Sequence, residues 1–157
     1  LTGLYGRRGL DTELRRRLRG DDYRVSAVAV LDLDGFKAFN DAHGHQAGDR
    51  RLVQTAQLLR TGVRSAVLAR MGGDEFLVIG TGTSRAEVDA IVGDLRGLVA
   101  PPDGAPLIAG SVGVVLVPRL DPRLLPEAVA LADAALYEAK ADRSLRIVVR
   151  DPSGVVA

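Results

Sequence analysis

RMGGDEFLVIG, residues 70–80, places two adjacent glycines and two carboxylates between two short apolar runs. The runs, residues 66–70 and 76–80, predict the arms of a β-hairpin, because glycine supplies positive φ at a tight turn without a Cβ clash. Taken alone, Asp74 and Glu75 are explained equally well as a soluble hairpin tip, since Gly and Asp dominate turns. Other segments must therefore decide whether the tip has a chemical role.

The composition favours one globular domain without covalent cross-links. The 157 residues include no cysteine, which excludes disulfides and thiolate ligands and agrees with a reducing, cytoplasmic location. A chain of this length buries about 70% of its unfolded surface. We expect a single domain over residues 1–157, excised from a longer multidomain protein because residue 1 is leucine and not methionine.

Charge and hydropathy exclude two classes of partner. The net charge of +1 provides no strong field directed at nucleic acid. The longest apolar stretches are shorter than the ~18 residues that span a bilayer. We therefore expect no nucleic-acid partner and no membrane contact from this segment.

Alternating helix and strand patterns predict an α+β (α/β sandwich) fold, with a mixed central sheet, surrounding helices and the hairpin. The continuous apolar run 25–33 predicts a strand covered on both faces. Helices are expected over residues 10–19, 36–42, 46–60, 84–99 and 125–141. Strands are expected over residues 25–33, 66–70, 76–80, 107–117 and 145–150.

Carboxylates from distant segments form a candidate metal site. Asp32 lies near the carboxyl end of the predicted buried strand, where such sheets usually bind ligands, although a turn hydrogen bond explains it equally well in isolation. Asp34, followed by Gly35 and a helix, is interpreted as a turn or N-cap residue and not as a ligand. Asp74 and Glu75 add the oxygen ligands that Mg²⁺ prefers.

Glycines and lysines point to a phosphate near these carboxylates. Gly72 and Gly73 would let the backbone approach a bulky phosphate closely. Lys37 and Lys140 are the only lysines among 21 basic residues. Lys37 shares a helix face with Asn40, so both can contact a single ligand. Lys140, near a helix C-terminus, is either a second phosphate contact or a residue that compensates the helix dipole.

Two polar residues favour a guanine base. The amide of Asn40 suits a base edge, and Asp49 at the start of the next helix is most simply explained by the helix dipole. With a nucleotide bound, the Asp49 carboxylate can accept hydrogen bonds from N1–H and the 2-amino group of guanine, which adenine cannot provide. His43 and His45 are two residues apart without further ligands, so we expect no zinc site.

Five segments together resemble, in order and spacing, the GGDEF domain family of diguanylate cyclases: LTGLYGRRGL, LDLDGFKAFNDAHGHQAGDRRL, RMGGDEF, SVGV and ADAALYEAK. The resemblance covers essentially the whole chain. It implies a fold similar to nucleotide-cyclase and polymerase palm domains and the condensation of two GTP to cyclic di-GMP, a bacterial second messenger, with release of pyrophosphate. It further implies one GTP per protomer of a homodimer, and sensory or phosphodiesterase domains elsewhere in the full-length chain.

The same resemblance implies roles for individual residues. Mg²⁺, or alternatively Mn²⁺, would be held by Asp32, the backbone carbonyl of Leu33, Asp74 and Glu75, and the last two would be catalytic, with Asp74 as the proton acceptor. Asn40 and Asp49 would hold guanine, and the lysines would approach phosphates. The substrate-binding set would be Gly35, Phe36, Lys37, Asn40, His45, Asp49, Gly72, Gly73, Lys140 and Arg143.

Three positions depart from the family pattern. Many members carry an Arg-x-x-Asp inhibitory product site, which corresponds here to Val63 and Ala66. A Gly-Arg-Asn segment usually follows the Ala-Lys pair, whereas Lys140 is followed by Ala-Asp-Arg-Ser, so a phosphate-binding arginine is absent or shifted to Arg143. Gly6 stands where asparagine is frequent.

The altered segment after Lys140 supports an alternative function. In this alternative the chain is a catalytically weak or inactive GTP-binding domain that regulates an attached domain, for instance a cyclic di-GMP phosphodiesterase. A purely structural interaction domain would explain the fold but not the carboxylates expected to converge from distant segments.

Overall fold

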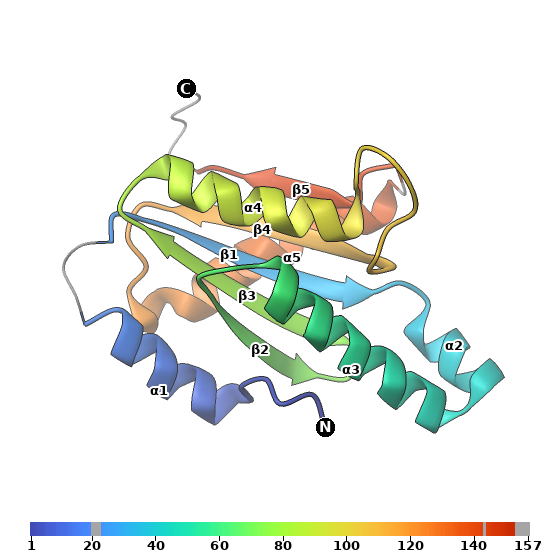
Figure 1. Cartoon of the computed structure of the whole chain (residues 1–157). Helices are drawn as coiled ribbons and strands as arrows, with labels where there is room; N and C mark the ends of the chain where they lie inside the picture. Colours follow the sequence, from blue (N-terminus) through green and yellow to red (C-terminus); the bar gives the residue numbers. More distant parts are fainter. Residues whose placement is uncertain (20–22, 143, 153–157) are drawn as a thin grey trace.

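A computed structural model describes residues 1–19, 23–142 and 144–152. Its centre is a five-stranded sheet with the strand order β2-β3-β1-β4-β5 (Figure 1). The strands are β1 (Val25–Leu33), β2 (Ala66–Gly72), β3 (Glu75–Gly82), β4 (Gly110–Val117) and β5 (Ile147–Arg150). β1 is antiparallel to β3 and β4, β2 is antiparallel to β3, and β5 is parallel to β4. The expected mixed sheet is thus confirmed.

Helices cover both faces of the sheet (Figure 1). They are α1 (Arg7–Arg17), α2 (Phe36–His43), α3 (His45–Gly62), α4 (Arg85–Val99) and α5 (Leu125–Ala141). Alternate side chains of β1 enter two separate hydrophobic clusters, one shared with α3 and α4 and the other with α1 and α5. This arrangement confirms that the central strand is buried on both faces, as its continuous apolar run predicts.

Two strands begin later than predicted because a turn or loop contact competes with the strand, whereas the helix expected over residues 10–19 begins earlier and spans Arg7–Arg17. The strand expected from residue 107 begins at Gly110, because Ile108 N–H donates to the Leu98 carbonyl at 3.0 Å, which draws the chain toward α4. The strand expected from residue 145 begins at Ile147, because Leu145 N–H closes a turn onto the Asp142 carbonyl at 2.8 Å.

Two local features shape the surroundings of the carboxyl end of β1. Gly35, with a φ of 64°, turns the chain from β1 into α2. α5 lies so close to β4 that a Cβ on Gly113 would be 2.1 Å from the Ala132 carbonyl oxygen. The helix therefore rests on strand backbone, which fixes the height of its C-terminal residues above the sheet.

Among the described residues, no helix combines the length and apolar character required to cross a bilayer.

Candidate functional site

Sheet register brings the hairpin tip beside Asp32. In the antiparallel pairing of β1 with β3, Asp32 lies directly opposite Glu75, and on the other side of β1 it lies opposite Ser111 of β4. The Asp32 side chain is 15% exposed, and Lys140 Nζ of α5 lies 2.7 Å from its Oδ1. Asp32, the hairpin and Lys140 therefore meet at one edge of the sheet, as the sequence predicts.

The electrostatics of Asp32 indicate a site of excess negative charge. Burial raises the pKa of Asp32 above its ordinary value of 3.8, while the hydrogen bond from Lys140 lowers the pKa in part. The negative charge of Asp74 raises the pKa further, and Asp34 adds a smaller effect in the same direction. A carboxyl whose pKa is raised by neighbouring carboxylates marks a position favourable to a cation.

Arginine and glycine shape the hairpin tip. Arg70 donates from Nε at 3.0 Å and from an Nη at 2.7 Å to the Gly73 carbonyl. Gly72 and Gly73 have φ values of 154° and 51°, next to a register shift between Arg70 and Gly72. A Cβ at either glycine would meet no heavy atom within 4 Å, so these glycines are required by backbone conformation and not by crowding. Close approach to a phosphate stays a prediction.

The donor set at this edge fits a hard divalent cation. Asp32, Asp74 and Glu75 offer carboxylate oxygens, and Leu33 offers a backbone carbonyl. Within residues 1–19, 23–142 and 144–152, no three His, Asp or Glu side chains are already arranged as a metal-binding group. The chemistry of the carboxylate and carbonyl oxygens suits Mg²⁺, which commonly binds one or two carboxylates and takes its remaining ligands from phosphate and water.

An unsatisfied amide marks a second region, between α2 and α3. Asn40 Oδ1 is buried without a hydrogen-bond partner. Gly48 of α3 faces it so closely that a Cβ there would lie 1.8 Å from Oδ1. Because buried polar atoms are almost always paired in folded proteins, this amide fits a position completed by a ligand. Asp49 follows on the exposed start of α3.

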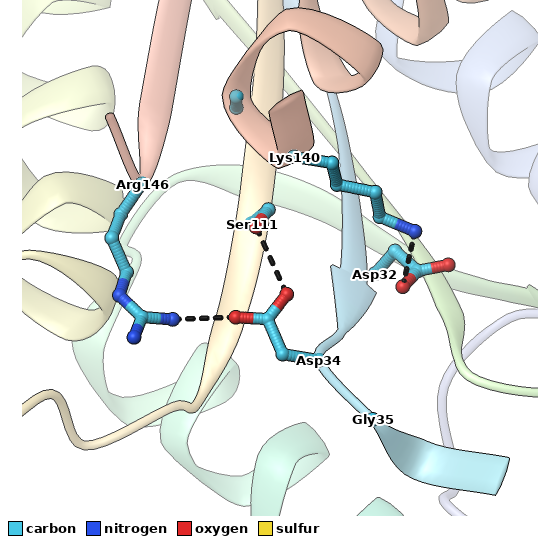
Figure 2. A pocket seen from close by; sticks show the side chains of 7 residues that line it. Asp32, Asp34, Gly35, Ser111, Lys140 and Arg146 are labelled. Atoms are coloured by element: carbon cyan, nitrogen blue, oxygen red, sulfur yellow. Dashed lines mark hydrogen bonds and ion pairs between the residues drawn. The ribbon is translucent and has the colours of Figure 1, made fainter. Parts of the chain in front are cut away.

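A pocket of about 460 Å³ lies between the end of β1, α5 and the residue before β5, and Figure 2 shows its charged side chains. Asp34 accepts from Ser111 Oγ at 2.9 Å and from Arg146 Nη1 at 2.5 Å. Asp34 lies in the turn before α2, as expected. Its interpretation as an N-cap is wrong, because Gly35 occupies that position and the Asp34 carboxylate is paired with Arg146.

Sequence reasoning missed Arg146 and Ser111 as pocket residues. Arg146 lies 112 positions from Asp34, and nothing distinguishes it locally in a chain whose basic residues are almost all arginine. Ser111 belongs to the SVGV segment, which carries no chemical signal beyond a short strand. Only the order of strands in the sheet reveals that these residues meet.

The remaining predicted substrate-binding residues lie at several distances from this pocket. Lys37 and His45 are exposed on α2 and at the start of α3, and neither lines it. Phe36 packs against the core cluster shared with α3 and α4. Arg143 lies outside the described residues. His43 stacks on Phe39 with ring centroids 4.5 Å apart, and its Nδ1 lies 3.0 Å from the Phe39 carbonyl oxygen.

Comparison with known proteins settles the family. A family model described as the GGDEF domain of diguanylate cyclases matches residues 1–146. The chain belongs to the GGDEF domain family. This GGDEF domain is 38% identical over 141 residues to a 19.3 kDa protein of Streptomyces ambofaciens, a match that covers 89% of the domain and 76% of that protein. It is 37% identical to the bifunctional diguanylate cyclase/cyclic di-GMP phosphodiesterase MucR of Pseudomonas aeruginosa, with 89% and 21% covered.

Solved structures agree with the family and the fold. The GGDEF domain of DgcB from Caulobacter crescentus, in complex with c-di-GMP, is 29% identical with a TM-score of 0.71, and the match covers 94% of this GGDEF domain and 92% of that chain. The diguanylate cyclase SiaD of Pseudomonas aeruginosa, in complex with its activator SiaC, is 34% identical with a TM-score of 0.72, with 95% and 60% covered. The domain spans only about a fifth of MucR.

Proposed function

We propose that this domain is a diguanylate cyclase that condenses two GTP into cyclic di-GMP and pyrophosphate. The observation that supports this proposal most directly is the convergence of Asp32 and Asp74. Asp32 comes from β1 and Asp74 from the turn between β2 and β3, and the charge of Asp74 raises the pKa of Asp32 beside Lys140 and an open pocket. A site of this kind has a clear use in phosphoryl transfer, where catalysis consists of positioning and charge neutralisation.

Each half-reaction forms one phosphodiester bond. The 3′-hydroxyl oxygen of one GTP attacks the α-phosphorus of the other, the bond between the α- and β-phosphates breaks, and pyrophosphate leaves. Asp74 would accept the hydroxyl proton. Bound Mg²⁺ would neutralise phosphate charge, held by Asp32, Asp74, Glu75 and the Leu33 carbonyl. Lys140 would move its charge from Asp32 to a phosphate as the cation binds.

The guanine base would bind between α2 and α3. Asn40 has an unpaired buried oxygen there, and Asp49 offers a carboxylate that adenine could not satisfy. We propose the exposed His45 as part of the same region and Lys37 as a phosphate contact from α2. One such region per chain against two guanines per product requires two protomers, so we propose a homodimer as the active species.

The surrounding protein is also part of the proposal. The name of MucR gives it both diguanylate cyclase and cyclic di-GMP phosphodiesterase activity, and the domain matches only 21% of its length. We propose sensory or phosphodiesterase domains in the full-length chain and a cytoplasmic location, where GTP is available.

One experiment separates the cyclase from a silent GTP-binding module. The protein is incubated with GTP and Mg²⁺, and the products are separated by chromatography. We expect cyclic di-GMP from the wild type and none from Asp74→Asn, which removes a ligand charge at constant size. Asp94→Asn, the same change on the exposed face of α4, is the matched control and should retain activity.

The regulatory alternative has a distinct signature. The domain is 34% identical to the cyclic di-GMP phosphodiesterase PdeR of Escherichia coli and covers 22% of it. The name of PdeR mentions the phosphodiesterase activity and no cyclase activity. Stabilisation of the fold by GTP without any cyclic di-GMP would favour this alternative, because ligand binding raises stability whether or not chemistry follows. Absence of both stabilisation and turnover would contradict both proposals.

A further inference from the structure

The pocket in Figure 2 contains a second ion pair that the proposed metal site does not use. Arg146 Nη1 lies 2.5 Å from Asp34 Oδ2, and the Arg146 side chain is 34% exposed. The other oxygen of Asp34 accepts from the hydroxyl of Ser111, which is buried. Both oxygens of Asp34 are therefore committed within the protein, and Asp34 orients an arginine instead of binding a metal.

The guanidinium of Arg146 keeps donors for a ligand. It carries five N–H groups in a planar fork, and Asp34 is its only hydrogen-bond partner within the part of the chain that the structure describes. The backbone of Arg146 is also fixed, because its carbonyl accepts from Val112 N–H at 2.8 Å, immediately before β5. The backbone of Arg146 is thus fixed, and one of its guanidinium nitrogens is paired with Asp34. A guanidinium fixed in this way, with further N–H groups left to donate, is preorganised for a phosphate group.

The two cations of the pocket are arranged for an extended anion. Lys140 pairs with Asp32 on one side of the view in Figure 2, and Arg146 pairs with Asp34 on the other side. Asp32 lies directly opposite Glu75 of the hairpin in the sheet, so the proposed reaction centre lies on the Lys140 side. A nucleotide whose reacting phosphate lies near Asp32 would extend its outer phosphates across the pocket toward Arg146.

We propose that Arg146 binds the β- and γ-phosphates of GTP, and that Asp34 and Ser111 are positioning residues that hold its guanidinium. The proposal rests on the proposed function, which supplies GTP as the ligand. The β- and γ-phosphates depart as pyrophosphate, so Arg146 would bind the charge that develops on this leaving group. It also gives the pocket an arginine despite the altered segment after Lys140.

Nucleotides of different phosphate number test the role of Arg146. 3′-Deoxy-GTP, which lacks the attacking hydroxyl, and GMP are titrated by calorimetry with Mg²⁺ into wild type and Arg146→Ala. We expect Arg146→Ala to bind 3′-deoxy-GTP about 10- to 100-fold more weakly, the loss typical of a charge-assisted hydrogen bond. Its affinity for GMP should stay within about twofold of wild type, since GMP lacks the contacted phosphates.

Two further variants control for the general loss of a nearby arginine and for misfolding of the alanine variant. Arg150→Ala removes an exposed arginine at the end of β5 that lines a different pocket, and it should bind both nucleotides as wild type does. Arg146→Lys keeps the charge without the fork and should give an intermediate affinity for 3′-deoxy-GTP. It replaces Arg146→Ala in the comparison if the alanine variant does not fold.

A double-variant cycle tests Asp34. If Asp34 acts by holding Arg146, then Asp34→Asn should weaken 3′-deoxy-GTP binding in the wild type but not in the Arg146→Ala background. Equal losses in both backgrounds would overturn the positioning role.

The results also separate this proposal from the cyclase itself. Unchanged 3′-deoxy-GTP affinity in Arg146→Ala, or an equal loss for GMP, would overturn the phosphate contact while GTP binding by the wild type stands. A wild-type protein that binds no 3′-deoxy-GTP would remove the proposed function and this inference together.

Discussion

At Asp32 the stability of the fold and the proposed chemistry make opposite demands. Burial, joined by the charge of Asp74, raises the pKa of Asp32 in the folded state despite the bond from Lys140. A carboxyl whose pKa is raised on folding favours the folded state below its unfolded pKa, near 3.8, and this favourable contribution is lost as pH rises through the folded value. At neutral pH the charge that a cation needs therefore weakens the apoprotein.

We predict that Asp32→Asn melts at a higher temperature than wild type at pH 7 in the absence of divalent cations. Its advantage should shrink as pH falls, because wild-type Asp32 then takes up its proton. The measurement is thermal denaturation followed by circular dichroism, repeated at pH values from 7 downward. Asp94→Asn is the exposed control. A lower melting temperature for Asp32→Asn at pH 7 would mean that the Lys140 pair outweighs burial.

Gly48 offers a test of the base-binding region that leaves its polar groups intact. A Cβ at Gly48 would lie 1.8 Å from Asn40 Oδ1, so Gly48→Ala must displace the amide. We predict roughly tenfold weaker 3′-deoxy-GTP binding by calorimetry, the loss of about one hydrogen bond. Gly93→Ala in α4 meets no atom within 4 Å and should only stabilise the helix, by about 0.5–1 kcal/mol. Wild-type affinity in Gly48→Ala would exclude Asn40 from the base site.

At the scale of elements, the connection from α3 to β2 bears on product inhibition. Val63, at one position of the family's inhibitory motif, is 3% exposed and belongs to the core cluster with α3 and α4. Ala66, at the other position, begins β2 and has no charged group. The connection itself is held by Arg17, which donates to the Ser65 carbonyl at 2.7 Å. A buried valine and an alanine cannot clamp an anionic product.

We therefore predict that cyclic di-GMP inhibits this domain only by competing with GTP. Initial rates measured over a matrix of GTP and cyclic di-GMP concentrations should show a constant maximal rate at saturating GTP. Inhibition that persists at saturating GTP would reveal a separate product site elsewhere on the chain.

Elements with a strong local pattern could be predicted from the sequence, and contacts between distant elements could not. The strand Val25–Leu33 and the helix Leu125–Ala141 match their predicted bounds, because a continuous apolar run and a helical apolar stripe are local properties of the sequence. The family resemblance could assign Asp32 to a metal and Lys140 to a phosphate of the same site, but not the ion pair between them. The Asp34–Arg146 pair could not, because it depends on β5 lying beside β4, for which the sequence contains no local signal.

At the scale of the whole molecule, the proposed function has to reconcile one proposed base-binding region per chain with a product of two nucleotides. A monomer with a single region cannot present both 3′-hydroxyls to both α-phosphates. Under the proposed function, the active species is a symmetric pair, and its fraction would rise with protein concentration by mass action.

We predict that specific activity rises with protein concentration. Initial rate per milligram is measured over a dilution series, with sedimentation of the same samples. A parallel coiled coil fused ahead of Leu1 should raise activity at low concentration without a new contact to GTP. Constant specific activity where sedimentation shows only monomer would rule out the two-protomer mechanism.

The close seating of α5 on β4 limits how this domain can be engineered. Its inner face is lined by alanines that pack against a strand with glycine at position 113, so one added methyl group there would lift the helix. Lifting α5 would carry Lys140 away from Asp32. Stabilising designs should therefore leave this interface unchanged and use positions such as Gly97 of α4, where an added Cβ meets no atom within 4 Å.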